Sequence, residues 1–159
     1  MAVARYRLLT TWLLEAPRPQ VWDVLQDVCA WPQWWEGAES VVELDAGDHR
    51  RVGSRYRVRW RGRVPYAVEI EFVVDVVREP ALMEGRSSGA LVGAGRWRLF
   101  EEAGVTAVTY EWDVRTSPRW MNAAAPLARP LLTANHDWVM RRGGEGLAGR
   151  LGARLVAGG

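Results

Sequence analysis

The sequence predicts an α+β fold in which a curved antiparallel sheet of about seven strands wraps around one long C-terminal helix. Three observations lead to this prediction. Apolar and polar residues alternate through most segments between residues 3 and 116, which is the period of half-buried strands. Near the end of the chain, apolar residues recur at helical spacing instead. The length of 159 residues, with 48% hydrophobic and 25% charged, fits one folded domain.

The first element is predicted to be a strand over residues 3–14. Tyr6 and Trp12 share one parity there, while Arg5 and Arg7 occupy the other. Two short helices follow. Val21, Trp22 and Leu25 recur at helical spacing behind a first-turn proline. The segment Trp31–Trp35 has room for only a single helical turn, although it contains three tryptophans.

Further strands are predicted from Ser40 to Thr116, where turn signals separate alternating segments. The clearest strands are Arg55 to Arg61, Tyr66 to Val77, Gly95 to Phe100, and Val105 to Thr116. The glycine-rich segment Gly89 to Gly95 is predicted to be a turn.

The last helix is predicted to run from about Leu131 to about Leu155, after the helix-interrupting Pro126 and Pro130. Its apolar stripe includes His136 and Met140. The stripe also passes through a run of glycines, which weakens helix propensity by about 1 kcal/mol per residue. We therefore expect these glycines to let the helix backbone approach the sheet closely.

The predicted sheet is too wide for its helix. Seven strands at about 4.8 Å spacing span roughly 30 Å, whereas a helix with its side chains is about 10–12 Å wide. The sheet must curl around the helix, pair face to face with a second copy, or leave a hollow. The inward-facing residues favour a hollow because many are large amphipathic aromatics: Trp12, Tyr56, Trp60, Trp97, Tyr110 and Trp112.

Several segments together resemble a known superfamily. They are Trp12, Pro17, Val21-Trp22-Asp23-Val24-Leu25 with Asp27, Trp31-Pro32-Gln33-Trp34-Trp35, Gly89 to Gly95 before Arg96-Trp97, Thr109-Tyr110-Glu111-Trp112, and Asn135 to Met140 with Gly143 and Leu147. This pattern, which spans nearly the whole chain, resembles the SRPBCC superfamily (START-like, polyketide cyclase/dehydrase, Bet v 1-like).

The resemblance implies a helix-grip fold with a deep hydrophobic cavity between the sheet and the C-terminal helix. It implies one START-like ligand-binding domain over residues 1–155, followed by a short tail at 156–159. Members of the superfamily bind lipids, hormones or polyketides, and some catalyse cyclisation or dehydration. The superfamily shares no universal catalytic motif, so the resemblance assigns no catalytic residue to this chain.

The predicted ligand-binding residues combine the inward aromatics with the helix stripe. They are Trp34, Trp35, Tyr56, Trp60, Trp97, Tyr110, Trp112, His136 and Met140. Trp31, Trp34 and Trp35 are expected at the mouth of the cavity, with core packing as the alternative. His136 could act as a general acid or base near neutral pH, or it could be a buried structural histidine.

Other sites and partners are not predicted. The arginines at odd positions from Arg55 to Arg63 face Glu69 and Glu71 of the next strand, as on a solvated face, and the net charge is only +2. We therefore expect no nucleic-acid partner, and also no metal, no cofactor and no integral membrane association. Cys29 is the only cysteine, and no apolar leader or membrane-spanning segment is visible, which predicts a cytoplasmic protein.

Three functional hypotheses follow. The first is a module that binds a hydrophobic, aromatic, polyketide or lipid-like small molecule by apolar burial. The second is a cofactor-free cyclase, aromatase or dehydratase, in which Tyr56, Tyr110, His136 or Arg96 would move protons or stabilise an enolate. The third is an interaction protein whose dry sheet face is covered by a partner. The chain is expected to be a monomer or a homodimer.

Overall fold

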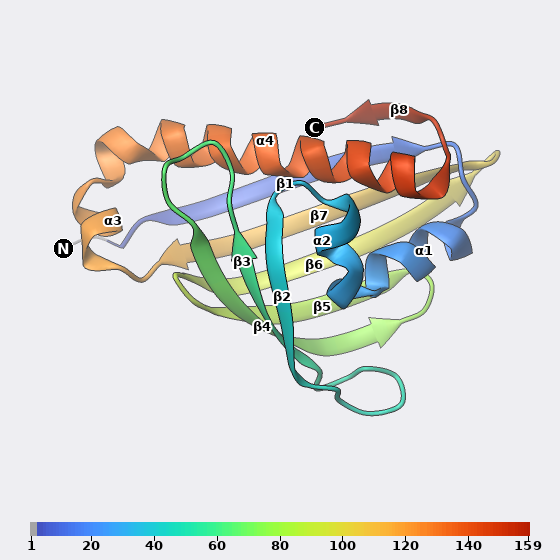
Figure 1. The fold of residues 1–159 in the computed structure, drawn as a ribbon, viewed down its shortest axis with the longest axis horizontal. Helices are drawn as coiled ribbons and strands as arrows, with labels where there is room; N and C mark the ends of the chain where they lie inside the picture. Colours follow the sequence, from blue (N-terminus) through green and yellow to red (C-terminus); the bar gives the residue numbers. More distant parts are fainter. Residues whose placement is uncertain (1–2) are drawn as a thin grey trace.

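The computed structural model describes residues 3–159 and shows one antiparallel sheet curved around a long helix (Figure 1). The eight strands are arranged in the order β2-β3-β4-β5-β6-β7-β1-β8. Their bounds are β1 Arg5–Leu14, β2 Ala38–Asp45, β3 Arg55–Trp60, β4 Val68–Arg78, β5 Leu82–Gly89, β6 Leu91–Glu102, β7 Val105–Thr116 and β8 Leu155–Gly158. This is the predicted α+β helix-grip architecture.

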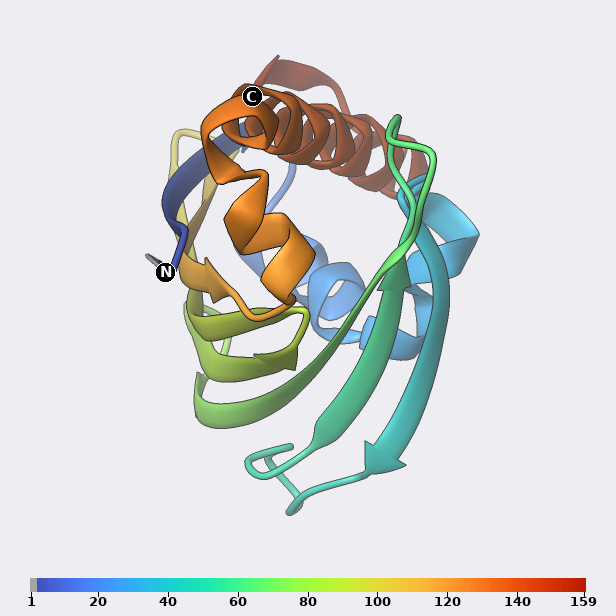
Figure 2. The ribbon, with the colours of Figure 1, turned by 90° about the vertical axis from the view of Figure 1, so that its left-hand side faces the viewer.

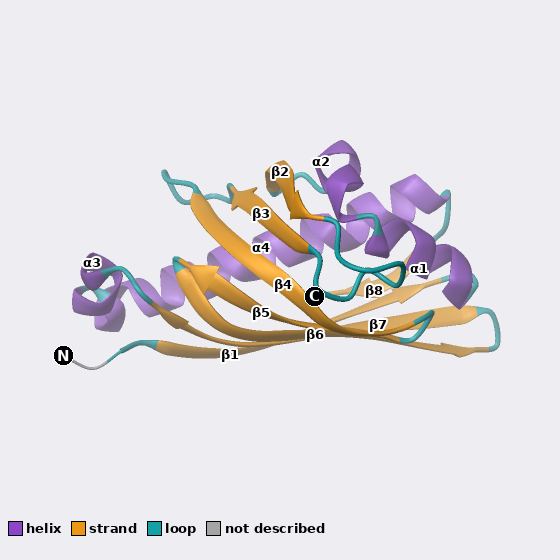
Figure 3. Cartoon of the chain, turned by 90° about the horizontal axis from the view of Figure 1, so that it is seen from below, coloured by secondary structure: helices purple, strands orange, loops and turns teal. Residues whose placement is uncertain are grey.

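The helices lie on the concave side and at the two ends of the sheet. Their bounds are α1 Arg18–Gln26, α2 Trp31–Trp34, α3 Arg119–Ala123 and α4 Ala125–Leu151, with a 3-10 turn, η1, at Val28–Ala30. The long helix α4 crosses the sheet from end to end, while α3 lies at one end and α1 and α2 lie at the other (Figures 1 and 3). The two short helices after the first strand are therefore confirmed.

Helix α4 begins and ends earlier than predicted. It starts at Ala125 rather than near Leu131, because Pro126 occupies its first turn and the exposed Pro130 is accommodated inside it. It ends at Leu151, where Gly152 adopts φ 63° and the Ala153 N–H donates to the Ala148 carbonyl at 3.0 Å. This pattern is a Schellman C-cap, which stops the helix before the predicted end at about Leu155.

The predicted turn over Gly89 to Gly95 is wrong in extent. Strand β6 already begins at Leu91, and Gly95 lies within it, paired with Gly85 of β5. A side chain at Gly95 would not fit, because its Cβ would lie 2.6 Å from the Tyr110 hydroxyl oxygen. These glycines make room inside the sheet rather than ending a strand.

The predicted tail at residues 156–159 also differs from the structure. Residues Leu155–Gly158 form β8, which pairs with β1 over Trp12 to Leu14 and covers only that part of its edge. Four residues give too short a pattern to be read as a strand from the sequence. The expected domain boundary after Leu155 therefore falls inside this strand.

The core is concentrated where α1, α2 and the second half of α4 meet the sheet. Trp12, Trp35 and Leu99 are among its fully buried side chains. Glycines in α4 allow this packing, since a Cβ at Gly143 would lie 2.5 Å from the Trp35 ring and one at Gly144 would lie 2.8 Å from the Trp12 ring. We call this half of the interior the closed end, and the half next to α3 the open end.

Candidate functional site

A cavity of about 160 Å³ lies between the sheet and α4. Its wall is mainly apolar, with aromatic side chains from five strands and from the segment around α2. The aromatic members are Tyr6, Trp31, Trp35, Trp60, Phe72, Trp97, Tyr110 and Trp112. The inward face of the sheet therefore borders an open space, as the width argument predicts.

The register of the strands explains where the hollow forms. In one transverse row, Tyr110, Trp97 and Met83 are paired neighbours, and their large side chains fill the space above the sheet. In the next row towards the open end, Trp112 pairs with Gly95, which pairs with Gly85. Two adjacent positions that border the cavity therefore have no side chain: Gly95 makes room for the Tyr110 hydroxyl, and Gly85 for the backbone of β4.

An aromatic wall runs along one side of this hollow. Trp97 and Tyr110 stack at 4.2 Å between ring centroids, and Trp112 and His136 stack at 5.7 Å. Tyr110 and Trp112 lie 6.2 Å apart with an interplanar angle of 34°, which joins the two pairs. The result is a series of ring faces that leads from the closed end to the open end.

Seven of the nine predicted ligand-binding residues line the cavity: Trp35, Trp60, Trp97, Tyr110, Trp112, His136 and Met140. Trp34 and Tyr56 do not line it. Trp34 stacks on Trp35 at 5.5 Å. Tyr56 is buried and packs on Phe72 at 5.3 Å. The parity of β3 correctly points Tyr56 inward, but Tyr56 borders a second, smaller cavity of about 80 Å³ together with Trp22 and Val28.

The prediction that the α2 tryptophans form the mouth is wrong for Trp31 and Trp35. These side chains are only 3% and 1% exposed, and both line the inner wall at the closed end. The indole N–H of Trp35 donates to the Val139 carbonyl at 2.8 Å, which ties α2 to α4. The alternative interpretation, core packing, describes both residues.

Helix α3 and the loop between β3 and β4 both lie at the open end (Figure 2). Trp120 of α3 meets Tyr66 of that loop edge to face, at 5.2 Å between centroids. The side-chain oxygen of Asn135 on α4 accepts hydrogen bonds from the backbone N–H groups of Arg63 and Val64 in the same loop, at 2.7 and 3.2 Å. Apart from Asn135, the residues that form the mouth belong to segments that the sequence analysis did not assign to the site.

His136 lies at the open end with a side chain that is only 10% exposed. Its Nδ1 lies 3.3 Å from a carboxylate oxygen of Asp137. Because a carboxylate only accepts, this contact assigns the proton of a neutral ring to Nδ1 and leaves Nε2 as an acceptor. Burial lowers the pKa of His136, and Asp137 partly offsets this effect. Nε2 is buried and has no partner among the described residues.

Two further polar groups near the cavity were missed by the sequence interpretation. The Tyr6 hydroxyl and the Ser87 hydroxyl are buried and have no hydrogen-bond partner within residues 3–159. Burial raises the pKa of Tyr6, although Arg129 nearby partly counteracts it. Tyr6 shares the parity of Trp12, so the alternation in β1 could have identified it. Ser87 lies in a segment with little apolar character and gave no such signal.

Tyr110 is a hydrogen-bond donor at neutral pH. It lies so deep in the protein that burial raises the pKa of its phenol above the ordinary value of 10.0. Its side chain is nevertheless not fully covered by protein atoms, because part of it faces the cavity. A protonated phenol can donate to a ligand oxygen, whereas a phenolate base would be unfavourable here.

Most charged residues lie outside the cavity, and the exceptions in its lining are Glu84 and Arg86 of β5. As predicted, Arg57 of β3 pairs with Glu71 of β4 at 2.6 Å, whereas Arg59 pairs with Glu39 of the other neighbouring strand, β2, at 2.6 Å. Arg96 is not among the residues that line the cavity, and its guanidinium pairs with Glu84 at 2.6 Å. Within residues 3–159, no helix is both long and apolar enough to cross a membrane.

Comparison with known proteins gives one family and a set of similar folds. The profile of the family described as "Polyketide cyclase / dehydrase and lipid transport" matches residues 10–152. A search of curated protein sequences finds no match.

Solved structures with the same fold include the Zhui aromatase/cyclase from Streptomyces sp. R1128, with a TM-score of 0.73 and 19% identity over 94% of both chains. A START superfamily protein from Mycobacterium smegmatis matches with a TM-score of 0.73 and 14% identity, over 92% of this chain and 97% of that one. A protein from Thermus thermophilus matches with a TM-score of 0.70 and 16% identity, over 92% of this chain and 99% of that one.

Proposed function

Since the chain belongs to the polyketide cyclase/dehydrase and lipid transport family, we propose that it binds a small planar aromatic molecule between its sheet and α4. The observation that carries this proposal is the series of stacked rings from Trp97 to His136 beside an unfilled hollow. Aromatic stacking adds about 0.5–1.5 kcal/mol to the free energy gained from burying the ligand.

The cavity volume limits the size of the ligand. About 160 Å³ is close to the volume of engineered apolar cavities that bind benzene, at about 150 Å³. It is smaller than the roughly 300–1,000 Å³ of pockets for drug-sized ligands. The cavity in this conformation therefore suits a single substituted ring. A polycyclic ligand requires α3 and the β3–β4 loop to separate at the Trp120–Tyr66 contact.

The polar groups at the open end define the orientation of the ligand. His136 Nε2 accepts a hydrogen bond, so it selects a ligand that carries a donor such as a hydroxyl group. The Tyr6 hydroxyl can donate to a ligand oxygen, and the Ser87 hydroxyl can do either. Leaving such buried groups unsatisfied costs about 1–3 kcal/mol each, which a hydroxylated ligand would recover. We therefore expect a ring whose oxygen substituents lie towards α3.

Calorimetric titration with toluene and p-cresol tests the proposal, because the two probes differ only in a hydroxyl group. We expect both to bind, and p-cresol to bind roughly threefold to tenfold more tightly, as one net hydrogen bond of about 0.5–1.5 kcal/mol predicts. His136→Phe should remove the preference and keep the binding of toluene. Leu132→Trp should fill the cavity and abolish both.

The matched control is Phe100→Trp, because Phe100 lies on the exposed surface of β6 outside the cavity. This variant should bind both probes as the unmodified chain does. Binding of neither probe by the unmodified chain would refute the proposal. Unchanged binding by Leu132→Trp would show that the probes bind elsewhere.

A second candidate function is that of a cofactor-free cyclase, aromatase or dehydratase acting in the same cavity. His136 favours it, because a neutral imidazole with a free Nε2 is suited to remove a proton from an enolisable ligand. Tyr110 or Tyr6 would then donate a hydrogen bond to the enolate oxygen.

Deuterium exchange at C2 of benzoylacetone, followed by NMR, measures this step directly. Catalysed exchange that is lost in His136→Gln, with affinity for benzoylacetone retained, would support the enzyme. Binding of benzoylacetone without catalysed exchange would contradict the enzyme and support only the binding function.

A further inference from the structure

We propose that the open end of the molecule docks on an anionic lipid surface, so that the cavity mouth faces the membrane. This inference is independent of the proposed ligand, since it rests on side chains outside the cavity. The surface comprises exposed apolar residues and exposed arginines around the mouth. We call it the mouth patch, and its members are Trp120, Leu127, Leu131, Arg63, Arg115, Arg119 and Arg129.

The apolar members are unusually exposed. Trp120 is 55% exposed, Leu127 is 89% and Leu131 is 56%. Leu127 and Leu131 are four residues apart on α4 and therefore share one helix face. Large exposed apolar side chains gathered on adjoining elements mark an interaction surface in a folded protein.

Each element of the mouth patch is joined to the cavity rim. Trp120 precedes Met121, and Leu131 precedes Leu132, and both of these neighbours line the cavity. The guanidinium of Arg129 lies over the Tyr6 ring, 5.0 Å from its centroid. Figure 2 views the molecule from this side, with α3 and the first turns of α4 nearest the viewer. A surface that covers the patch would therefore also cover the mouth.

The segment that forms α3 and the first turns of α4 carries only positive charge. The sequence from Val114 to His136 contains arginines but no aspartate or glutamate. Among the described residues, none of the four patch arginines lies within 4.0 Å of a carboxylate.

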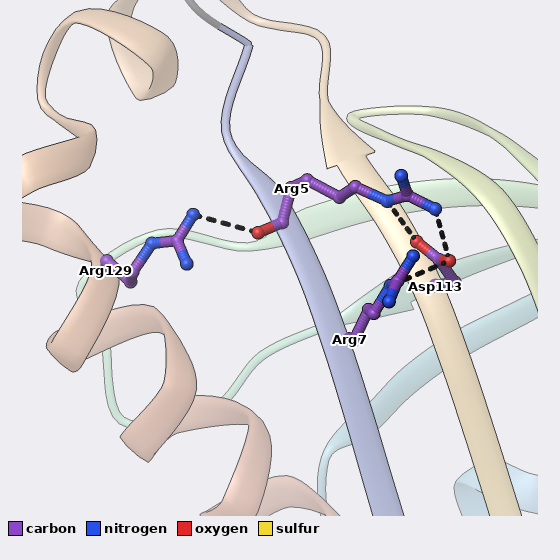
Figure 4. A network of polar contacts seen from close by, with 4 residues as sticks. All are labelled: Arg5, Arg7, Asp113 and Arg129. Carbon is purple, nitrogen blue, oxygen red and sulfur yellow. Dashed lines mark hydrogen bonds and ion pairs between the residues drawn. The ribbon is translucent and has the colours of Figure 1, made fainter.

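The nearest acidic residue on β7, Asp113, is already paired with two arginines outside the mouth patch. The Asp113 carboxylate receives Arg5 at 2.7 Å and Arg7 at 3.4 Å, while Arg129 donates to the Arg5 carbonyl (Figure 4). Two arginines on one carboxylate leave an excess positive charge beside the patch. Pairing with Arg5 and Arg7 also lowers the pKa of Asp113, so this group stays ionised and engaged at neutral pH.

Apolar and aromatic side chains flanked by unpaired arginines match the interface of an anionic bilayer. Tryptophan and leucine enter the boundary between headgroups and acyl chains, and arginines contact the phosphates. A hydrophobic ligand could then pass between bilayer and cavity without crossing water. No membrane-spanning helix is needed for this mode of binding, and none is found within residues 3–159.

Vesicle flotation with the full chain tests the proposal. We expect the protein to float with vesicles of phosphatidylcholine and phosphatidylglycerol, and not with phosphatidylcholine alone. Raising the salt concentration should weaken the interaction, because arginine–phosphate attraction is screened. Trp120→Ser should lower vesicle affinity roughly tenfold. Arg119→Gln should lower it about fivefold, which corresponds to about 1 kcal/mol per arginine.

Two matched controls lie at the other end of the molecule. Phe100 is 55% exposed, like Trp120, but it lies near the end of β6 furthest from α3. Arg150 lies on α4 in its last turn. Phe100→Ser and Arg150→Gln should leave vesicle binding unchanged, and circular dichroism should show all four variants folded.

Several outcomes would overturn the proposal. Failure to float with anionic vesicles excludes a lipid partner. Equal losses from Trp120→Ser and Phe100→Ser would show that the location of the patch is irrelevant. If size-exclusion chromatography instead shows a dimer that Trp120→Ser dissociates, a second copy of the chain covers the patch.

Discussion

The closed and open ends of this molecule use the same sheet and the same helix to opposite effect. At the closed end the glycines are in the helix, where Gly143 and Gly144 bring the α4 backbone against Trp35 and Trp12. At the open end they are in the sheet, where Gly95 makes room for the Tyr110 hydroxyl and Gly85 for the β4 backbone, and both border the cavity. The glycines of the helix bring α4 against the sheet, whereas those of the sheet add no side chain to the cavity wall.

Tryptophan also has two roles along this axis. Trp12 and Trp35 fill the closed end and contact each other edge to face at 5.5 Å. Trp112 stands beside the hollow and presents a ring face to it. A high tryptophan content therefore does not by itself indicate a cavity, because much of it serves packing.

The largest expected difference between the two ends concerns stability. Trp35→Ala should lower the free energy of unfolding by about 3–5 kcal/mol, because the side chain is only 1% exposed and packs against Trp12, Trp31 and Trp60. It also removes the hydrogen bond to the Val139 carbonyl. Trp112→Ala should cost only about 1–2 kcal/mol, since one side of this ring already borders empty space. Urea denaturation measures both, and equal losses would contradict the division into two ends.

A second test compares two glycines of α4. Gly143→Ala should destabilise the protein by about 2 kcal/mol, because its Cβ would lie 2.5 Å from the buried Trp35 ring. Gly149→Ala should stabilise it by about 0.5–1 kcal/mol, because nothing lies within 4 Å and alanine favours the helix. Thermal melting compares the two variants. A gain in both would show that α4 does not need close contact at the closed end.

A third test compares two buried hydroxyl groups. At the closed end, the Thr106 hydroxyl donates to the Ala16 carbonyl at 2.6 Å, so Thr106→Val should cost about 1–2 kcal/mol. At the open end, the Ser87 hydroxyl has no partner among the described residues. Ser87→Ala should therefore be neutral or stabilising by up to about 1 kcal/mol. Urea denaturation measures both variants. A clear loss of stability in Ser87→Ala would show that the Ser87 hydroxyl makes a hydrogen bond in the folded protein.

The smallest effect concerns pH. Burial lowers the pKa of His136 below its ordinary value of 6.5 in the folded state, so the unfolded chain binds more protons between the two pKa values. The stabilising contribution is therefore complete above about pH 6.5 and is lost as the pH falls towards the folded-state pKa. The melting temperature should be lower at about pH 5.5 than at about pH 7.5.

His136→Gln should flatten this pH dependence, whereas His49→Gln, a substitution in an exposed turn, should retain it. The carboxyl groups with lowered pKa values do not interfere. Pairing with arginines lowers the pKa of Glu39 and Asp75 from ordinary values of 4.5 and 3.8, so both titrate below this pH window. An unchanged slope in His136→Gln would assign the effect to another group.

Much of this fold follows from residue alternation. The strands around Tyr56, Ile70 and Trp112 have apolar residues at every second position, and the structure places each of them close to its predicted range. The second half of α4 follows from its apolar stripe. These elements could be predicted because they bury large apolar side chains, and a hydrophobic sequence pattern identifies such elements.

The rest of the site depends on small residues, which give no apolar pattern, and on contacts between segments that are far apart in the sequence. Strand β5 has Gly85 and Ser87 among the residues that border the cavity. Because neither is a large apolar residue, the alternation that would identify this strand is weak. The mouth forms where α3 meets the β3–β4 loop, through contacts such as Trp120 with Tyr66 that no local pattern encodes. The position of His136 was predictable from the stripe, but the absence of a partner for Nε2 required the surrounding strands.

The pairing of β1 has a consequence for synthesis of the chain. This strand is made first, yet its partners are β7 and β8, which include the last part of the sequence. At about 5–20 residues per second, several seconds pass before β7 leaves the ribosome. During that time neither backbone edge of β1 has its native partner strand. The cell must therefore keep a newly made first strand from pairing with other chains until the second half of the domain is complete.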